Sequence, residues 1–444
     1  MTTVIQPFRP SDSAPRVRIE THGCKLNMAD SQRMAREFVL AGYAIAMDGD
    51  APDVYVLDSC TVTQVADRKA RQSLARARRS FPDALIVATG CLAQRDAAGV
   101  EDLAAVDLVV TNREKRRLTS MVTDRLDVSL TPRTDGAPPK GTGLLLGRSR
   151  ASLKIQEGCD QVCSYCIVPY VRGRERSVPQ EILVQQVARL VDEGCREVVL
   201  TGTQLGSYGF DLPDANLSSM LRRVLGETEI ERLRVSSLQP GEITPELLEV
   251  WSLEGDGRLC PHFHMPLQSG SDPILTRMRR RYTREDFVAA VGQVRSALPD
   301  VSITGDAIAG FPGESEEDHR STLEIVERVE FADLHVFPYS ERPGTSAAHL
   351  EDVVDLHDRA RRAAELRERA SRSSMKVRQN AIGAVRPVLW ENETRAPGAP
   401  AMGLTDTYLR VRRDGSPEST GLANEIERVR LVRLDGETLV GEPV

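Results

Sequence analysis

A short loop that holds three cysteines constrains this chain more than any other part of its sequence. The loop reads Gly158-Cys159-Asp160-Gln161-Val162-Cys163-Ser164-Tyr165-Cys166, and it follows an alternating segment, 152–156, that predicts a short strand. Thiolates at C-x-x-x-C-x-x-C spacing can bind three irons of a [4Fe–4S] cluster from one tight loop, because soft sulfur ligands select iron–sulfur centres. The fourth iron would have no protein ligand in the loop and would be open to a small molecule.

Two other interpretations of this loop stay open. A structural zinc ion usually takes four ligands in two close pairs, whereas this loop offers three thiols. The other alternative is three cysteines without a common role, and the regular spacing makes it the least favoured of the three interpretations.

Length, charge and cysteine usage limit the class of protein. The chain has 444 residues, enough for two to three domains with large cores. Its net charge of −7 means that binding of a polyanion must depend on local basic patches. Residues 1–7 lack the basic and apolar runs of a signal peptide, and no apolar run reaches membrane-spanning length. We therefore expect a cytoplasmic protein with no membrane segment, whose cysteines bind metal rather than form disulfides.

Strands and helices alternate through the first part of the chain. The pattern predicts strands at 17–21, 54–57, 85–88 and 108–110, and helices at 30–40, 64–80 and 113–125. Such alternation is typical of a parallel, doubly wound α/β sheet, and we assign residues 16–125 to one domain. A stretch rich in Thr, Pro, Gly and Arg, 126–150, predicts a linker to the next domain.

Three further cysteines lie just past the carboxyl ends of strands in this domain. Cys24, Cys60 and Cys91 follow the strands predicted at 17–21, 54–57 and 85–88. In an open α/β sheet these ends form one crevice, where ligands bind, so the three thiols can converge. One such cysteine alone would more often be a small buried hydrophobe. The recurrence favours a second three-thiolate cluster, again with one iron that has no protein ligand.

The helix predicted at 64–80 is strongly basic. It carries one acid, Asp67, against six cations, which are Arg68, Lys69, Arg71, Arg76, Arg78 and Arg79. A solvated helix face is the usual reason for such a run of charge. In an acidic protein this excess slightly favours contact with a phosphate backbone.

Residues 151–375 continue the alternation and form the predicted second domain. Strands are predicted at 152–156, 197–200, 233–236, 262–265, 301–304 and 334–337, with helices at 180–193, 217–225, 245–251, 284–298 and 317–329. About six βα units indicate an incomplete (β/α)6 barrel with its active site at the carboxyl ends of the strands. His262 and His264 share one strand, and we expect only one of them to face the lumen. Cys195 and Cys260 have no cysteine neighbours, so we predict that neither binds metal.

The pattern changes after a highly charged helix predicted at 355–376. Short alternating strands follow at 385–390, 408–412 and 428–432. Short strands with Gly-rich turns indicate a small β-barrel, to which we assign residues 376–444. Tyr408, Arg410 and Arg412 alternate along one predicted strand, which is consistent with a face that stacks on bases and contacts phosphate.

The order of these parts resembles one family. The cysteine loop, with the aromatic Tyr165 just before its last cysteine, resembles the radical S-adenosylmethionine (SAM) superfamily. Together, the three parts across roughly residues 16–444 resemble the methylthiotransferases, whose last domain is the TRAM RNA-binding module. Two segments are similar to the members that act on N6-threonylcarbamoyladenosine in tRNA, Gly23-Cys24-Lys25-Leu26-Asn27 and His335-Val336-Phe337-Pro338-Tyr339-Ser340.

The resemblance implies a radical SAM methylthiotransferase with two [4Fe–4S] clusters and SAM. One cluster would bind SAM and give the radical that takes hydrogen from C2 of the adenine, and its ligands would be Cys159, Cys163 and Cys166. The other would present the sulfur that a second SAM methylates, on Cys24, Cys60 and Cys91. The implied SAM contacts are Tyr165, Gly202, Gln204, Ser236, Gln239, Gln268 and Gly310. Gln239 departs from the family, which commonly has Glu there, and Gln204 stands at a variable position.

The implied partners are a tRNA anticodon loop, an external electron donor such as flavodoxin or ferredoxin, and a sulfur source. An anticodon loop is already single-stranded, so a base can be extruded from it at relatively low cost. Alternatives within the family act on N6-isopentenyladenosine in tRNA or on a ribosomal protein. Alternatives outside it are an iron–sulfur protein that binds RNA without turnover and a zinc-binding RNA module.

Overall fold

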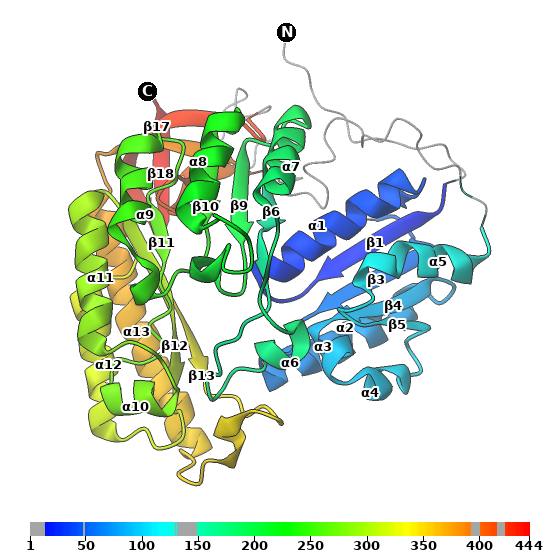
Figure 1. The fold of residues 1–444 in the computed structure, drawn as a ribbon, viewed down its shortest axis with the longest axis horizontal. Coiled ribbons are helices and arrows are strands. Elements are labelled where there is room, and N and C mark those ends of the chain that lie inside the picture. Colours follow the sequence, from blue (N-terminus) through cyan, green and yellow to red (C-terminus); the bar gives the residue numbers. More distant parts are fainter. Residues whose placement is uncertain (1–13, 48, 129, 131–148, 392–399, 415–421) are drawn as a thin grey trace.

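The computed structural model describes residues 14–47, 49–128, 130, 149–391, 400–414 and 422–444. Most of the predicted linker, 126–150, lies outside these residues. Along the chain, an α/β part in blue and cyan is followed by a central part in green and yellow and by a small β-barrel in red (Figure 1).

The N-terminal part is a parallel sheet with helices on both faces. The strand order is β2-β1-β3-β4-β5, from β1 (Arg16–Thr21), β2 (Ala44–Ile45), β3 (Val54–Ser59), β4 (Leu85–Gly90) and β5 (Leu108–Val110). One face packs on α1 (Lys25–Leu40) and α5 (Leu118–Leu126), and the other on α2 (Gln64–Ser80), α3 (Cys91–Arg95) and α4 (Ala97–Glu101). The predicted doubly wound sheet is confirmed.

The central strand β3 is buried on both faces. Val54 and Val56 pack with α1 and α5, whereas Tyr55 and Leu57 pack with α2. Successive side chains of a strand point to opposite faces, so a continuous apolar run suits a parallel strand that is covered twice. The strand order reverses between β1 and β3, and the crevice at the carboxyl ends of two such strands is where open α/β sheets bind ligands.

The central part is an open barrel of parallel strands. Two sheets, β10-β9-β6 and β11-β12-β13, contain β6 (Arg150–Lys154), β9 (Glu197–Thr201), β10 (Arg232–Val235), β11 (His262–His264), β12 (Ser302–Ala309) and β13 (Asp333–Pro338). Parallel bridges between Leu233 and Leu259 and between Ser237 and His264 join the two sheets. The accompanying helices are α7 (Gln180–Asp192), α8 (Leu217–Glu227), α9 (Pro245–Glu249), α11 (Arg284–Ala297), α12 (Glu316–Val329) and α13 (Leu356–Asn380). The predicted incomplete barrel is confirmed.

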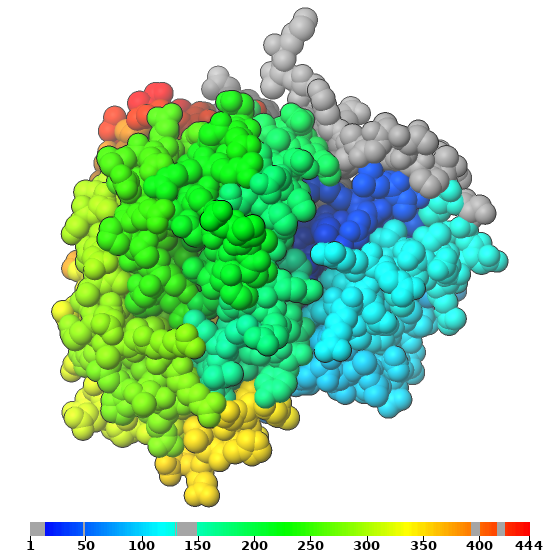
Figure 2. All heavy atoms as spheres, viewed as in Figure 1, coloured from blue at the N-terminus to red at the C-terminus, as the bar shows by residue number. Residues whose placement is uncertain are grey.

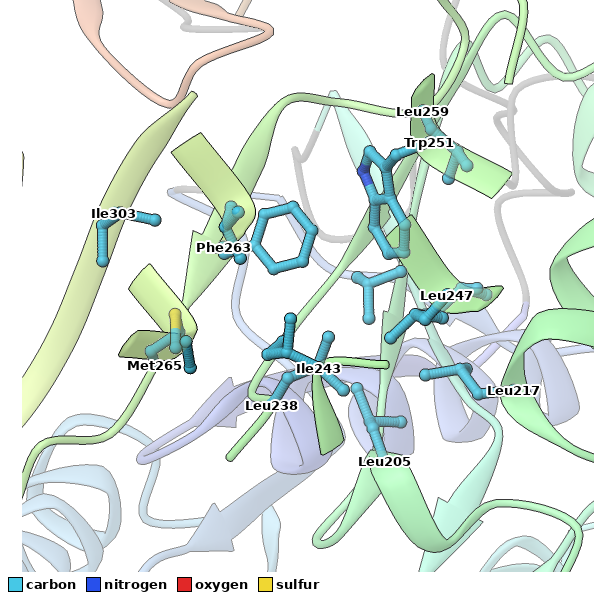
Figure 3. Close-up of a cluster of buried hydrophobic side chains, with 14 of the residues drawn as sticks. Leu205, Leu217, Leu238, Ile243, Leu247, Trp251, Leu259, Phe263, Met265 and Ile303 are labelled. Carbon is cyan, nitrogen blue, oxygen red and sulfur yellow. The ribbon is translucent and has the colours of Figure 1, made fainter. Parts of the chain in front are cut away.

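A dry cluster holds the strands and helices of this barrel together. Figure 3 shows part of it, in which Trp251 and Phe263 lie against leucines from the neighbouring loops and helices. The two ring centroids are 4.8 Å apart, and the Trp251 indole donates to the carbonyl of Cys260 at 3.1 Å. The buried indole N–H is therefore satisfied without breaking the apolar contact.

Several short elements complete the two larger parts. They are α6 (Val168–Arg172), α10 (Asp272–Arg277), the hairpin of β7 (Gln156–Glu157) and β8 (Arg176–Ser177), and the short turns η1 (Lys115–Arg117), η3 (Leu205–Ser207), η4 (Pro240–Glu242), η5 (Val250–Glu254) and η6 (Ser346–His349). The helix predicted at 30–40 begins earlier, at Lys25, directly after Cys24. No helix in the described part of the chain has the length and apolar character to cross a membrane.

The N-terminal and central parts meet in a continuous contact (Figure 2, blue and cyan against green). α1 packs beside β6, and α3 packs beside α6. Two ion pairs across this boundary reinforce the contact, Arg36 with Glu193 and Arg342 with Asp67, each at 2.6 Å.

The C-terminal part is a closed barrel of five strands in the order β14-β15-β16-β18-β17. These strands are β14 (Val385–Trp390), β15 (Ala401–Thr405), β16 (Arg410–Arg413), β17 (Ile426–Asp435) and β18 (Thr438–Pro443). The predicted small β-barrel is confirmed, although the sequence pattern did not indicate β15 or β18. The helix α13 runs through the predicted boundary at 376 and ends at Asn380.

The predicted RNA-facing strand around Tyr408 is wrong. β16 begins at Arg410, and Tyr408 lies in the preceding turn with a φ of +69°. Its ring stacks on His262, with centroids 4.4 Å apart, rather than standing on the barrel surface. Arg410 pairs with Glu391 at 3.2 Å, and Arg412 pairs with aspartates on both sides, so these two cations are already balanced.

The turn that carries Tyr408 closes the amino-terminal end of the central barrel. It contacts the first residues of three consecutive barrel strands, which are Arg232, His262 and Ser302.

Buried arginines on β10 hold this turn in place. Arg234 has no exposed surface, and it donates to Glu197 at 2.9 Å, to the Asp406 carbonyl at 2.9 Å and to the Thr405 carbonyl at 3.2 Å. Burial alone would raise the pKa of Glu197, but Arg232 and Arg234 lower it to about 2. The C-terminal barrel is thus joined to the central barrel by buried, charge-assisted hydrogen bonds.

We expect Arg234→Met to lower the free energy of unfolding by about 3–5 kcal/mol, because it removes one partner of a buried ion pair. Urea titration followed by circular dichroism measures the loss. Arg222→Met is the matched control, since Arg222 pairs with Glu246 and Glu254 on the surface and should contribute about 1 kcal/mol or less. Equal losses in the two variants would contradict the structural role of Arg234.

Candidate active site

The three-cysteine loop 158–166 is held in a fixed shape by backbone contacts. Gly158 has a φ of +82°, and a Cβ there would lie 1.9 Å from the Arg174 carbonyl oxygen, so only glycine fits. The Cys159 amide donates to the Gly173 carbonyl at 3.1 Å. Further along, the Ser164 amide donates to the Met278 carbonyl at 3.0 Å. The loop is therefore fixed at both ends before any metal binds.

The thiols of this loop lie close enough to influence one another. Burial raises the pKa of Cys159 to about 11 and that of Cys166 to about 12, and the neighbouring thiols of the loop add to the rise. These groups are thiols at neutral pH until a metal displaces their protons.

Arg280 lies beside the loop, and sequence reasoning missed it. Its guanidinium donates to Cys163 Sγ at 3.3 Å and to Gln239 Oε1 at 2.7 Å. A cation that donates to a sulfur ligand stabilises the thiolate and tunes a cluster. The run Arg279-Arg280-Arg281 is the signal in the sequence, but nothing local distinguishes the middle arginine.

Two of the three glutamines predicted to contact SAM, Gln204 and Gln239, belong to one polar network. The side-chain Nε2 of Gln239 donates to Gln204 Oε1 at 2.7 Å, and the backbone N–H of Gln239 donates to the Glu242 carboxylate at 2.8 Å. Burial raises the pKa of Glu242 to about 7. The carboxyl group that is missing at Gln239 is therefore available three residues later, in η4.

Three other predicted SAM contacts lie outside this polar network. Gly202 and Ser236 follow β9 and β10 at the carboxyl end of the barrel. Tyr165 packs edge-on against Phe311, with ring centroids 6.4 Å apart. The SAM contacts of these residues stay predictions.

The two remaining positions, Gln268 and Gly310, have left-handed backbones, with φ of +62° and +71°. A Cβ at Gly310 would lie 2.1 Å from Arg359 Cγ, so close packing against α13 accounts for this glycine. The roles of both residues in SAM binding stay predictions.

The second triad lies at the carboxyl ends of neighbouring strands, as the strand pattern indicated. Cys24 follows β1, Cys60 follows β3 and Cys91 follows β4. Gly23 has a φ of +112°, and a Cβ there would lie 2.7 Å from the Cβ of Cys60, so glycine permits the close approach of the two loops. Burial raises the pKa of Cys60 to about 12, and Cys24 and Cys91 both contribute to the rise. The three thiols are thus neighbours in space.

Buried positive charge surrounds this triad. Arg172, from α6, and Lys115, from η1, both favour the thiolate form of Cys91, although burial raises the pKa of that thiol. Both cations bind Asp30, Arg172 at 2.7 Å and Lys115 at 3.2 Å. Three thiolates would add negative charge to this region, and these cations would attract it although they also pair with carboxylates.

The two triads lie side by side. α6 begins two residues after Cys166, and α3 begins with Cys91. Cys91 packs with Ile167 and Val171 in one small apolar cluster. The segment that follows the first triad therefore rests directly on the second.

That the two triads hold clusters rather than single ions stays a prediction. In the described ranges, no three His, Cys, Asp or Glu side chains gather closely enough to hold one metal ion. A zinc ion draws all its ligands to one centre at about 2.3 Å, whereas each thiolate of a [4Fe–4S] cluster binds its own iron. The sulfurs also have the donors that clusters accept, because the Val62 amide lies 3.5 Å from Cys60 Sγ and Arg280 lies 3.3 Å from Cys163 Sγ.

A cavity of about 1840 Å³ opens where the N-terminal sheet meets the carboxyl end of the barrel. Cys24 and Cys60 line it from one side, and Gly202 and Ser236 line it from the other. It is larger than the roughly 300–1,000 Å³ of typical small-molecule sites. The space can therefore take SAM together with a segment of a larger substrate.

The expectation that only one of His262 and His264 faces the lumen is wrong. Both rings lie within 3.0 Å of Thr304 Oγ1, and both line the cavity. Residues two apart in a strand point to the same face, which the expectation overlooked. Of the remaining cysteines, Cys195 and Cys260 are buried, with 3% and 1% of their surface exposed.

The basic helix α2 is less available to RNA than its sequence indicated. Arg71 pairs with Asp96, Arg76 with Glu20 and Arg78 with Asp107. These partners come from other segments, so the sequence of the helix could not reveal them. The other cations of the run, Arg68, Lys69 and Arg79, are exposed.

Comparison with known proteins gives matches over nearly the whole chain. "Uncharacterized protein family UPF0004" matches residues 16–111, and "Radical SAM superfamily" matches residues 153–326. The threonylcarbamoyladenosine tRNA methylthiotransferase MtaB of Bacillus subtilis is 35% identical over 94% of each chain. MtaB of Aquifex aeolicus is 37% identical over 91% of this chain and 98% of its own. A tRNA-2-methylthio-N(6)-dimethylallyladenosine synthase of Syntrophobacter fumaroxidans is 35% identical over 99% and 98%.

Among solved structures, the radical SAM methyltransferase TsrM from Kitasatospora setae, with cobalamin and a [4Fe–4S] cluster bound, has a TM-score of 0.52. It is 16% identical and covers 75% of this chain and 77% of its own, so the likeness shows the fold. The curated relatives named above cover 91–99% of this chain. The protein is therefore an enzyme that belongs to the radical SAM methylthiotransferase family, whose superfamily uses a [4Fe–4S] cluster and SAM.

Proposed function

We propose that this enzyme attaches a methylthio group to C2 of N6-threonylcarbamoyladenosine, 3′ of the anticodon in tRNA. The observation that carries the proposal is the shared cavity. It is lined by Cys24 and Cys60 of one triad and by Gly202 and Ser236, which follow strands of the radical SAM barrel. A substrate in this cavity would lie against the second triad and beside the strand ends where the resemblance implies SAM contacts, although the cysteine loop itself does not line the cavity.

The residues fit two clusters. Cys159, Cys163 and Cys166 would hold the SAM-binding cluster, and Cys24, Cys60 and Cys91 would hold the cluster that presents sulfur. When bound, these groups and SAM would supply the radical and sulfur chemistry that an unreactive C–H bond requires.

The chain contributes position and charge to this chemistry. Arg280 joins the first triad to Gln239, so it links the cysteine loop to the predicted SAM contacts. Arg172 and Lys115 place positive charge beside the second triad. Glu242, whose pKa burial raises to about 7, can accept hydrogen bonds in the same network as the two glutamines.

The rim of the cavity supports a macromolecular substrate. Large apolar side chains from both parts line it and are largely exposed, and these are Val62, Val65, Phe337, Val353 and Leu356. Exposed apolar patches of this kind mark interaction surfaces, and unstacked bases can rest on them. Arg68 and Lys69 lie on α2, beside Val65, where a phosphate backbone would pass.

The names of the relatives support a tRNA substrate but divide between two modified adenosines. Several are named for threonylcarbamoyladenosine, whereas others are named for dimethylallyladenosine. Both names refer to tRNA, which favours tRNA over a ribosomal protein. We assign the compartment to the cytoplasm, where cysteines stay reduced, and infer a flavodoxin- or ferredoxin-like electron donor and a separate sulfur source.

Mass spectrometry of tRNA nucleosides from cells that lack this protein tests the proposal. We expect 2-methylthio-N6-threonylcarbamoyladenosine to disappear and its unmodified precursor to accumulate. Loss of the dimethylallyl product instead would assign the enzyme to the alternative substrate.

Cys163→Ala should abolish reductive cleavage of SAM, because it removes one of the three thiols proposed to hold the SAM-binding cluster. This is the thiol that Arg280 contacts. Anaerobic assay of 5′-deoxyadenosine measures the effect, and iron analysis should show that the second cluster is retained. Cys195→Ala is the matched control, since this buried cysteine lies outside both triads and should keep the iron content of the wild type. Continued formation of 5′-deoxyadenosine by Cys163→Ala would show that the loop does not hold the SAM-binding cluster.

Cys60→Ala should keep SAM cleavage but lose the methylthio product, because the second triad would be incomplete while the cysteine loop is untouched. Chromatography of both products from one reaction with a modified RNA stem-loop gives the ratio directly. Normal product formation would mean that Cys24, Cys60 and Cys91 only pack the core of the sheet.

A further inference from the structure

We propose that the Lys25 ammonium binds a carboxylate on the N6 substituent of the substrate adenosine and so selects anionic over apolar substituents. This proposal rests on the proposed function, because it concerns the adenosine that occupies the shared cavity. Lys25 is the first residue of α1 and lies at the cavity wall.

Lys25 differs from the other cations of this cavity. Among the described lining residues, the basic groups other than histidine are Lys25, Lys69, Arg359 and Arg367. Arg359 donates to the carbonyls of Tyr339 and Val354, and Arg367 donates to that of Val336. Lys69 is exposed on α2. Lys25 is half-buried, and within the described chain no carboxylate contacts its ammonium.

Acidic groups near Lys25 already have partners. Asp306 accepts from His264 at 3.0 Å and from His335 at 3.2 Å. Asp333 lies 3.7 Å from the other nitrogen of His335. Asp306 acts on Lys25 through its charge, but its carboxylate oxygens bond the two histidines, and no carboxylate of the described residues forms an ion pair with Lys25. An incoming anion could therefore pair with the Lys25 ammonium directly.

Positive charge also gathers around the Tyr408 ring, which faces the same cavity. Lys25 Nζ lies 5.5 Å from the ring centroid, and the guanidiniums of Arg150 and Arg234 lie at 5.9 and 5.1 Å. Arg234 is committed to Glu197, and Arg150 is 3.6 Å from Glu391. The local field therefore favours an anion on the side of the cavity where Lys25 can reach it.

The chemistry of the substituent agrees with this placement. A threonylcarbamoyl group ends in a carboxylate, whereas a dimethylallyl group is apolar. The urea N–H of a threonylcarbamoyl group can bond N1 of the same adenine, which turns the carboxylate toward the side of the ring that carries C2. Since Cys24 and Lys25 both line the cavity, a base whose C2 faces the second triad could extend its carboxylate toward Lys25.

The test compares two RNA stem-loops that differ only in charge. One carries N6-threonylcarbamoyladenosine, and the other carries its methyl ester, which removes the negative charge and adds one methyl group. We expect wild-type enzyme to prefer the acid by roughly 10- to 100-fold in kcat/KM, the range of one charged hydrogen bond. Lys25→Met should bring the ratio of acid to ester close to one.

Lys69→Met is the matched control, because it removes a lysine from the same cavity. It should change binding of acid and ester by the same factor, so their ratio stays at the wild-type value. Fluorescence anisotropy with both RNAs repeats the comparison without turnover, so a loss of iron in Lys25→Met would not obscure the result.

Three outcomes would overturn the inference. Equal use of acid and ester by the wild type, with methylthio product formed, would remove carboxylate recognition and leave the proposed function intact. A preserved preference in Lys25→Met would assign the carboxylate to another residue. Modification of dimethylallyladenosine RNA alone would overturn both the proposed function and the inference.

Discussion

The site depends on a buried ion network centred on Asp30 of α1. Its carboxylate accepts from Lys115 of the N-terminal part at 3.2 Å, and from Lys154 and Arg172 of the central part at 2.7 Å each. Lys115 also binds Asp58 at 2.9 Å, and Arg172 binds Glu157 at 2.8 Å. Three carboxylates thus meet three cations across the boundary between the two parts. Because Arg172 lies six residues beyond Cys166, the network sets where the cysteine loop sits against the second triad.

Such a network contributes more to geometry than to stability. Taking charges out of water costs several kcal/mol per ion, and their mutual attraction repays this only when every partner is present. Asp30 is 1% exposed, and although burial alone would raise its pKa, the three cations lower it well below the usual value. Loss of one member would leave its partners charged and buried. The two triads are therefore held side by side by a contact that tolerates little displacement, which the proposed reaction, in which both would take part, requires.

The local sequence pattern was sufficient to predict the fold class and the position of the second triad. Strand periodicity places Cys24, Cys60 and Cys91 at strand ends without any knowledge of distant contacts. Arg172, Lys115 and Arg280 could not be found in this way, since their importance comes from partners far along the chain. The ion pairs that occupy Arg71 and Arg78 were hidden for the same reason. Tyr408 shows another limit: a shift of two residues in a strand start turned an expected surface aromatic into a buried contact.

The turn around Tyr408 also bears on the order in which molecules reach this enzyme. The Tyr408 ring stacks on His262, and Arg232 and Arg234 hold the turn, so the turn covers the amino-terminal end of the barrel. In the proposed reaction, SAM and its products would exchange near the carboxyl end of the barrel, beside the cavity that a tRNA loop would cover. Bound nucleic acid would cover the cavity opening. Used SAM could then be replaced only after the nucleic acid dissociates. The rate of a multi-step reaction in such a cavity would then depend on how often the nucleic acid leaves the cavity opening.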